Sequence, residues 1–285
     1  MFINGLRFFI TKSCNILFTT SEHIINGNSK TLLASLKEVK KLYMQHGFKI
    51  RTILMDGQFE CLHWDLSRMK INLSTCTYNT LVGEIERIIL AIKESACGIF
   101  NTLPFTKLTG CIIVELLSFV LFWLNVLGES IASDLSLFTV MKGLTVSYKR
   151  HCVIKFCEYV QTHEYHDNKL QTRTIGAIAL RPTGNYQRSH LFISLVTDKN
   201  STRTTVPRSQ CPKKSSTTYI DSHNAIPVDG VSATATATLF PMMPTIMTTT
   251  ATSHTFRLKK MTRAPMRVWT SSLTMIPMMT MYLHQ

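Results

Sequence analysis

Apolar positions along residues 1–198 follow the spacings of regular secondary structure. Residues 6–12 and 15–25 are rich in β-branched and aromatic side chains, which predicts two strands. Residues 29–46 carry apolar side chains every three to four positions, which predicts an amphipathic helix that ends at Gly47. Residues 48–55 are mostly apolar and lead into an Asp-Gly turn signal, so we expect a buried strand there.

Two more helices and a second group of strands are predicted downstream. The helices span residues 84–99 and 107–126. Short apolar runs separated by turn signals then predict strands at 153–161, 175–181 and 191–197. Strands mixed with helices, followed by strands alone, predict an α/β core and a small β-barrel after it.

The chain therefore divides into three expected parts. Residues 1–140 form the α/β core, and residues 150–198 form a small β-rich module. Residues 199–285 are a low-complexity tail: from residue 201 onward, 18 of 85 residues are Thr and 9 are Met. This tail has no sustained helical or strand period, so we expect it to be disordered. An alternative origin is an acidic segment read in the wrong frame, because Asp and Glu codons read one base late give Met, Thr, Lys or Arg.

The charge of the chain indicates the class of partner. Lys and Arg number 31 against 17 Asp and Glu, a net charge of +14, which favours a nucleic acid or an anionic membrane over a neutral metabolite. The 8 cysteines are spread singly, without a close pair, which is typical of reduced thiols. Arg7 and Lys12 interrupt the apolar start that a signal peptide would need, so we expect a location in the nucleus or cytoplasm.

The most apolar run of the chain is residues 111–127. It is at the short limit for crossing a bilayer, and it contains Glu115 and Asn125. A charge near the middle of a membrane span costs about 3 kcal/mol. We therefore expect a helix that packs against the sheet, with Glu115 at the surface or paired with a basic side chain. A single-pass membrane protein anchored by this segment is the alternative.

Asp56 at the end of a buried strand and a Glu on a later helix form the pattern that two-metal nucleases and strand transferases use. In those enzymes two or three carboxylates hold a pair of metal ions that stabilises the attacking and leaving oxygens of a phosphate. The spacing alone is a weak signal, because an Asp-Gly pair after a strand is usually a turn.

The amino-acid sequences of several segments are a more specific signal of function than this spacing. ILMDGQFE at 53–60, VGEIERIILAIKE at 82–94 and FTKLTGCIIVELLSFVLFWLN at 105–125 resemble, in that order, the integrase core of copia-type retrotransposons. FCEYVQTHEYHDNKLQTRTIGAIALRPTGN at 156–185 is similar to the β-rich region that follows this core. The resemblance covers residues 1–198 and rests on the order of the motifs rather than on any one of them.

This resemblance implies a ribonuclease-H-like fold that joins DNA ends to target DNA with Mg²⁺. The family has three acidic metal ligands in the order Asp, Asp, Glu. Asp56 matches the second ligand, and Glu86, which precedes Arg87 as in the family's E-R pair, matches the third; Glu84 is the fallback. The implied partners are DNA and further copies of the chain.

The first ligand of the family has no counterpart in this sequence. In the family this ligand lies on the first strand, just before the segment that MFINGLRFF resembles. No Asp precedes Asp56 in the present sequence. A site that lacks one bridging carboxylate should hold a metal pair poorly. We therefore expect an integrase-like core with an incomplete first strand that is catalytically defective.

Two basic residues on the predicted 84–99 helix are candidates for DNA contact. Arg87 follows Glu86 directly, and Lys93 lies seven residues after Glu86, two turns along the same helix face. There Lys93 could meet a phosphate, although a solvated lysine gives the same pattern. The sequence predicts a fragment that binds nucleic acid without sequence preference, either as a degenerate integrase or as a DNA-binding remnant.

Overall fold

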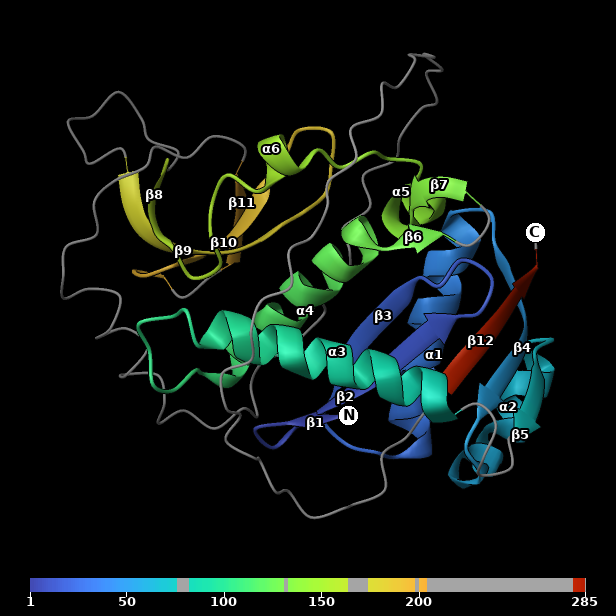
Figure 1. The fold of residues 1–285 in the computed structure, drawn as a ribbon. Helices are drawn as coiled ribbons and strands as arrows, with labels where there is room; N and C mark the ends of the chain where they lie inside the picture. The colour runs from blue at the N-terminus through green and yellow to red at the C-terminus, as the bar shows by residue number, and fades with distance from the viewer. Residues whose placement is uncertain (76–81, 131–132, 164–173, 198–199, 204–278, 285) are drawn as a thin grey trace. The chain divides into compact units, whose positions relative to one another are not determined.

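A computed structural model describes residues 1–75, 82–130, 133–163, 174–197, 200–203 and 279–284, all within one compact unit (Figure 1). Two main sheets and three long helices, α1, α3 and α4, organise the described residues. The first half contains β1 Phe2–Ile3, β2 Leu6–Ser13, β3 Thr19–Ile24, α1 Ser29–Gln45, β4 Lys49–Met55, the 3-10 helix η1 Gly57–Leu62, α2 His63–Arg68, β5 Asn72–Thr75 and α3 Val82–Phe100. The second half contains α4 Gly110–Leu127, β6 Glu129–Ser130, β7 Ser133–Ser136, α5 Leu137–Lys142, α6 Tyr148–His151, β8 Tyr159–His163, β9 Thr174–Pro182, β10 His190–Ser194, β11 Asn200–Arg203 and β12 Met279–His284.

The first sheet, here called the large sheet, has the order β1-β2-β12-β4-β5, with β3 on the other edge of β2. β2 and β3 are antiparallel, from Arg7↔Ile24 to Lys12↔Thr19. β4 and β5 are parallel, as expected for strands joined by a connection that crosses over the sheet. The two halves of the sheet are joined through β12, the last strand of the chain.

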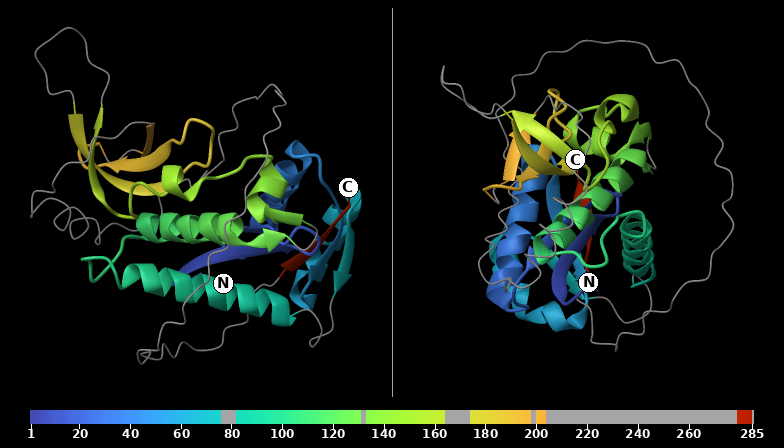
Figure 2. Two further views of the ribbon diagram at one scale, coloured as in Figure 1. Left: turned by 45° about the horizontal axis from the view of Figure 1, so that its top comes forward. Right: turned by 90° about the vertical axis from the view of Figure 1, so that its left-hand side faces the viewer.

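Helices cover both faces of the large sheet (Figure 2). Successive side chains of β2 point to opposite faces, so Phe9 packs in a cluster with α1, while Phe8 and Ile10 pack in a cluster with α3 and α4. All three residues are buried, and their apolar surface contributes to the stability of both layers.

The helix α1 confirms the prediction from its apolar spacing. Its buried side chains are Leu32, Leu36, Val39 and Tyr43, and they form one stripe that faces β3 and β4. The helix ends before Gly47, whose φ of +84° is a left-handed conformation that glycine adopts without steric cost.

The helix α4 confirms the expectation that the most apolar run packs inside the protein. It contacts β3 of the large sheet and β9 of the second sheet. Asn125 accepts a hydrogen bond from the Thr19 backbone N–H at 3.0 Å and donates one to the Thr19 carbonyl at 2.8 Å. Glu115 is 6% exposed, and its carboxylate accepts a hydrogen bond from Arg181 Nε at 2.9 Å. The predicted basic partner of Glu115 is therefore present, on β9.

The second sheet is antiparallel, with the order β11-β10-β9-β8. A separate cluster of buried side chains, formed by Ile154, Val160, Ala177, Ala179 and Phe192, supports it. Its first strand starts at Tyr159 rather than at residue 153, because residues 153–158 form turns before the ladder with β9 begins. Among the described residues the four strands form an open sheet rather than the barrel that the sequence favours.

Two segments of the expected disordered tail are strands, which corrects that expectation. Asn200–Arg203 pairs with β10, and Met279–His284 pairs with β2 and β4. β11 pairs with the strand just before it in the chain, whereas β12 pairs with distant strands, and composition reveals neither pairing. Residues 204–278 lie outside the described residues, so the rest of the expectation stays a prediction.

Candidate functional site

Asp56 lies directly after Met55, the last residue of β4, as predicted. It caps η1, and its carboxylate accepts a hydrogen bond from the Gly57 backbone N–H at 2.8 Å. The side chain is exposed, at the end of a strand whose preceding residues, Ile53 and Met55, are fully buried. Asp56 therefore lies at the carboxyl end of β4, where the sequence predicts it, and it also caps η1.

The two candidate glutamates lie in the first two turns of α3, as predicted. Glu86 is exposed to solvent. Glu84 pairs with Lys12 of β2, with 3.7 Å between its Oε2 and the lysine Nζ, and its side chain is 48% exposed. The fallback candidate Glu84 therefore contacts the large sheet, through Lys12 of β2. Because the Glu84 side chain is half-exposed, solvent screens this pair, which contributes at most about 1 kcal/mol.

The two candidate DNA-contacting residues have different surroundings. Arg87 is exposed on α3, whereas Lys93 is half-buried. The chain's first amino group, on Met1, donates a hydrogen bond to the Phe8 carbonyl at 2.8 Å and is buried. This burial, together with the positive charge of Lys93, lowers the pKa of the Met1 amino group from 8.0 to about 5. Lys93 therefore acts electrostatically on the start of the chain.

A metal site is not formed by the described residues. Among them, no group of three or more His, Cys, Asp or Glu side chains could hold a metal ion. Asp56 with Glu84 or Glu86 therefore does not fit the three-carboxylate site that the resemblance implies, and no catalytic step through Mg²⁺ follows from this arrangement.

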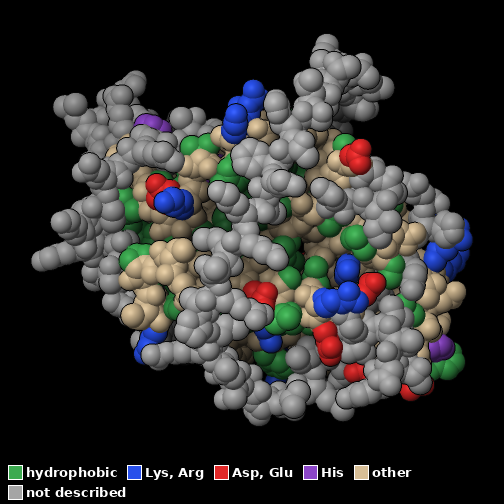
Figure 3. Space-filling view, viewed as in Figure 1, with side chains coloured by type: hydrophobic (Ala, Val, Ile, Leu, Met, Phe, Trp, Pro, Cys, Tyr) green, Lys and Arg blue, Asp and Glu red, His purple; other side chains and the backbone are tan. Residues whose placement is uncertain are grey.

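The charged side chains do not gather into a continuous patch on the face shown in Figure 3. Described Lys and Arg side chains are scattered there, and several lie beside Asp or Glu. The Lys12–Glu84 pair is one example of such neighbours in the large sheet region.

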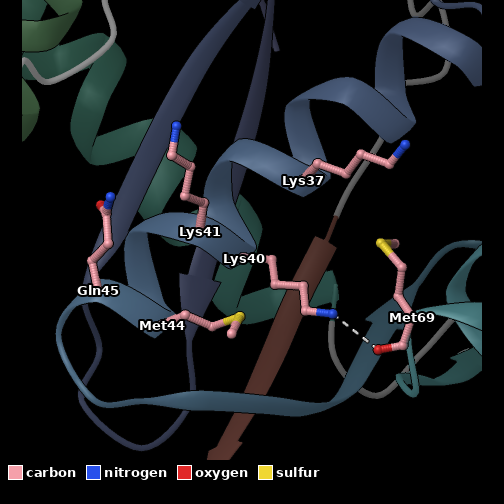
Figure 4. A pocket seen from close by; sticks show the side chains of 6 residues that line it. All are labelled: Lys37, Lys40, Lys41, Met44, Gln45 and Met69. Carbon is pink, nitrogen blue, oxygen red and sulfur yellow. Dashed lines mark hydrogen bonds between the residues drawn. The ribbon is translucent and has the colours of Figure 1, made fainter.

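A surface depression of about 490 Å³ lies beside α1 and is lined by Lys37, Lys40, Lys41, Met44, Gln45 and Met69 (Figure 4). The Lys40 ammonium donates a hydrogen bond to the Met69 carbonyl at 3.0 Å, which ties α1 to the segment after α2. Lys41 pairs with Glu38 on the same helix. This depression is wide open and contains none of the predicted site residues.

The feature that the sequence interpretation missed is β12. It lies beside β4, with Met279 opposite Met55 and Thr280 opposite Leu54, and so begins next to Asp56. The segment MTMYLH contains no Gly, Pro or acidic residue, and this absence of strand breakers is the signal that could have indicated a strand.

One helix of the described residues, α4, is long and apolar enough to cross a membrane, with a mean hydropathy of 2.2. Half of that stretch is buried inside the protein. Its polar residues Glu115 and Asn125 are both buried and both hydrogen-bonded to the protein.

The chain was also compared with known proteins. No protein-family model matches it, and no curated protein matches it either. Its structure is weakly similar to a chain of the simian T-cell lymphotropic virus intasome, solved by cryo-EM in complex with the PP2A regulatory subunit B56 gamma. The TM-score is 0.34 and the identity 14%, over 73% of this chain and 78% of that chain.

Proposed function

We propose that the chain is an integrase-like fragment, related to copia-type retrotransposon integrases, that binds nucleic acid without sequence preference and does not catalyse strand transfer. The observation that carries the proposal is the placement of three acidic residues. Asp56 follows β4, an inner strand of the large sheet, and Glu84 and Glu86 lie in the first turns of the next long helix, α3. These are the positions at which the resemblance places the second and third acidic ligands of the family.

Loss of catalysis follows from the ligand count. The resemblance implies three acidic ligands, of which only Asp56 and one of Glu84 and Glu86 have a match in this sequence. Two carboxylates leave a metal pair without its bridging ligand, so the charge that develops at a phosphate would not be stabilised. Mg²⁺ belongs to the mechanism of intact relatives and is not expected to activate this chain.

Binding without catalysis needs only the charge. A net charge of +14 attracts DNA through release of condensed counterions, whatever the base sequence. Arg87 is exposed on α3, and Lys93 lies on the same helix, so both are candidates for the phosphate contact. In this proposal the protein acts in the nucleus or cytoplasm, where it meets nucleic acid.

The deciding experiment measures strand transfer and DNA binding by the full chain. We expect weak binding of double-stranded DNA and no strand transfer with Mg²⁺ or Mn²⁺. Asp56→Ala is the control, and it should leave binding unchanged. Strand transfer by the natural chain that disappears in Asp56→Ala would contradict the defective-fragment proposal, and absence of any DNA binding at low salt would contradict the proposed function.

The alternative class is a single-pass membrane protein anchored by α4. The length and hydropathy of this helix favour it. The buried ion pair of Glu115 with Arg181 favours a helix that is packed inside the protein. This contact uses the helix face that a membrane span would turn to lipid or to another helix. Recovery of the expressed chain in detergent extracts alone would favour the membrane alternative.

A further inference from the structure

The large sheet has a position between β2 and β4 that is one strand wide, here called the slot. β3 occupies one edge of β2, and β5 occupies one edge of β4. The second edge of β4 faces the second edge of β2, whose first residues pair with β1. β12 fills the slot beside the end of that β2 edge. β12 runs antiparallel to β4 and parallel to β2.

The slot lies in the interior of the protein. On its two sides, Thr11 and Ser13 of β2 and Ile53 and Met55 of β4 are all 0–1% exposed. Without an occupant, the backbone N–H and C=O groups of two facing edges would lose their partners in this buried region. Each such unpaired group costs about 1–3 kcal/mol, so the slot strongly favours being filled.

β12 is held unevenly by its two neighbours. It pairs with β4 at six positions, from Met279↔Met55 to His284↔Lys49, but with β2 at only two, Thr280↔Lys12 and Met281↔Ser13. Its ladder with β4 is interrupted by a register shift between Tyr282 and Leu283. Among the described elements it is the last in chain order.

We propose that the slot is a strand-acceptor site, which binds an extended peptide antiparallel to β4, and that the chain's own segment Met279–His284 occupies it until such a peptide replaces it. Main-chain hydrogen bonds to a sheet edge supply most of the affinity in this mode of recognition. The buried flanks restrict the partner to a peptide without charged side chains over about six residues, because an unpaired charge in the slot would be desolvated. This inference does not depend on DNA binding.

The test uses the full chain and a fluorescent, acetylated and amidated peptide with the sequence of residues 279–284. A variant with Thr280→Pro and Met281→Pro removes two backbone donors of β12, one toward each neighbour, because successive N–H groups of a strand point to opposite edges. The matched control carries Thr280→Ala and Met281→Ala, which keep both donors. We expect the proline variant to bind the peptide at least about tenfold more tightly than the natural chain, and the alanine variant to bind it like the natural chain.

Two results would overturn the proposal: a proline variant that binds the peptide no better than the natural chain, or a peptide carrying the same two prolines that binds equally well. If the proline variant does not fold, the proposal is tested by cross-linking the peptide to the natural chain. The peptide, with a photo-reactive group and at millimolar concentration, should then cross-link to β4 or β2. Cross-links confined to other parts of the chain would show that the slot accepts no peptide.

Discussion

The contact between Glu115 and Arg181 ties the most apolar helix of the chain to the second sheet. The carboxylate is buried, and its partner nitrogen is 2.9 Å away. Sequence reasoning predicted that Glu115 needs a basic partner, because a buried, unpaired carboxylate is costly. It could not identify Arg181, which is 66 positions away in the chain and comes close only when β9 packs on α4.

Arg181→Ala should lower the free energy of unfolding by about 3 kcal/mol, since it leaves the Glu115 charge buried without a partner. Replacing both residues by Leu should cost much less than the single change. The measurement is urea-induced unfolding. Lys41→Ala is the control, because it breaks an exposed pair with Glu38 and should change stability by less than about 0.5 kcal/mol. If Arg181→Ala and Lys41→Ala lower the free energy of unfolding equally, the buried pair stabilises the fold no more than the exposed one.

Glu22 on β3 provides a second test at the residue scale. Burial first, and the nearby charge of Glu38 second, raise the pKa of Glu22 from 4.5 to about 7. The folded state therefore keeps a proton that the unfolded chain releases, so this group destabilises the fold increasingly as the pH rises from 4.5 to 7. Glu22→Gln should stabilise the protein at pH 8 by about 2 kcal/mol and leave it unchanged near pH 4.

The check on this prediction compares urea unfolding of the natural chain and Glu22→Gln at both pH values. The difference between the two proteins isolates Glu22 from other titrating groups. Glu38→Gln removes the secondary cause of the shift, so in that background the gain from Glu22→Gln should be smaller. A gain that is the same at both pH values would indicate an effect of packing instead.

At the scale of elements, β1 and β12 share one edge of β2. β1 pairs antiparallel with the start of β2, and Met1 exchanges backbone hydrogen bonds with Phe8. β12 pairs with Lys12 and Ser13 near the end of the same strand. Residues added before Met1 would each pair with the next residue of β2, so five of them would reach Ser13 and compete with β12.

A five-residue extension of alternating Val and Thr should therefore displace β12 and speed hydrogen exchange of residues 279–284 by at least about tenfold. It should also remove the buried amino group of Met1, whose pKa of about 5 makes the fold lose stability as the pH falls from 8 to 5. A Gly-Ser extension of the same length is the control, since it forms strands poorly. Unchanged exchange at 279–284 with the Val-Thr extension would show that β12 is not displaced from this edge.

For the whole molecule, the net charge of +14 predicts how binding depends on salt. The logarithm of the DNA association constant should fall linearly with the logarithm of salt concentration, by about 0.9 per phosphate contacted. Arg87→Gln should reduce this slope by about 1 if α3 faces the DNA. Lys37→Gln, on α1 at the opposite face of the large sheet, is the matched control. Equal slopes for both variants would show that no single face is preferred.

The sequence by itself determined the elements whose signals are local. The apolar stripe and Gly47 fixed the course and the end of α1, and the apolar run before Asp56 placed that residue at the end of β4. These features depend on neighbours within a turn of helix or along one strand, so the periodicity of side chains is enough to reveal them.

Only the tertiary structure decided which distant segments meet. A tail segment of ordinary low-complexity composition became the central strand β12, because backbone hydrogen bonds to β4 and β2 do not depend on a sequence pattern. The contact of Glu84 with Lys12, and of Glu115 with Arg181, likewise arose when α3 and α4 packed on the sheets. Such pairings join residues far apart in the chain, and local periodicity contains no information about their register.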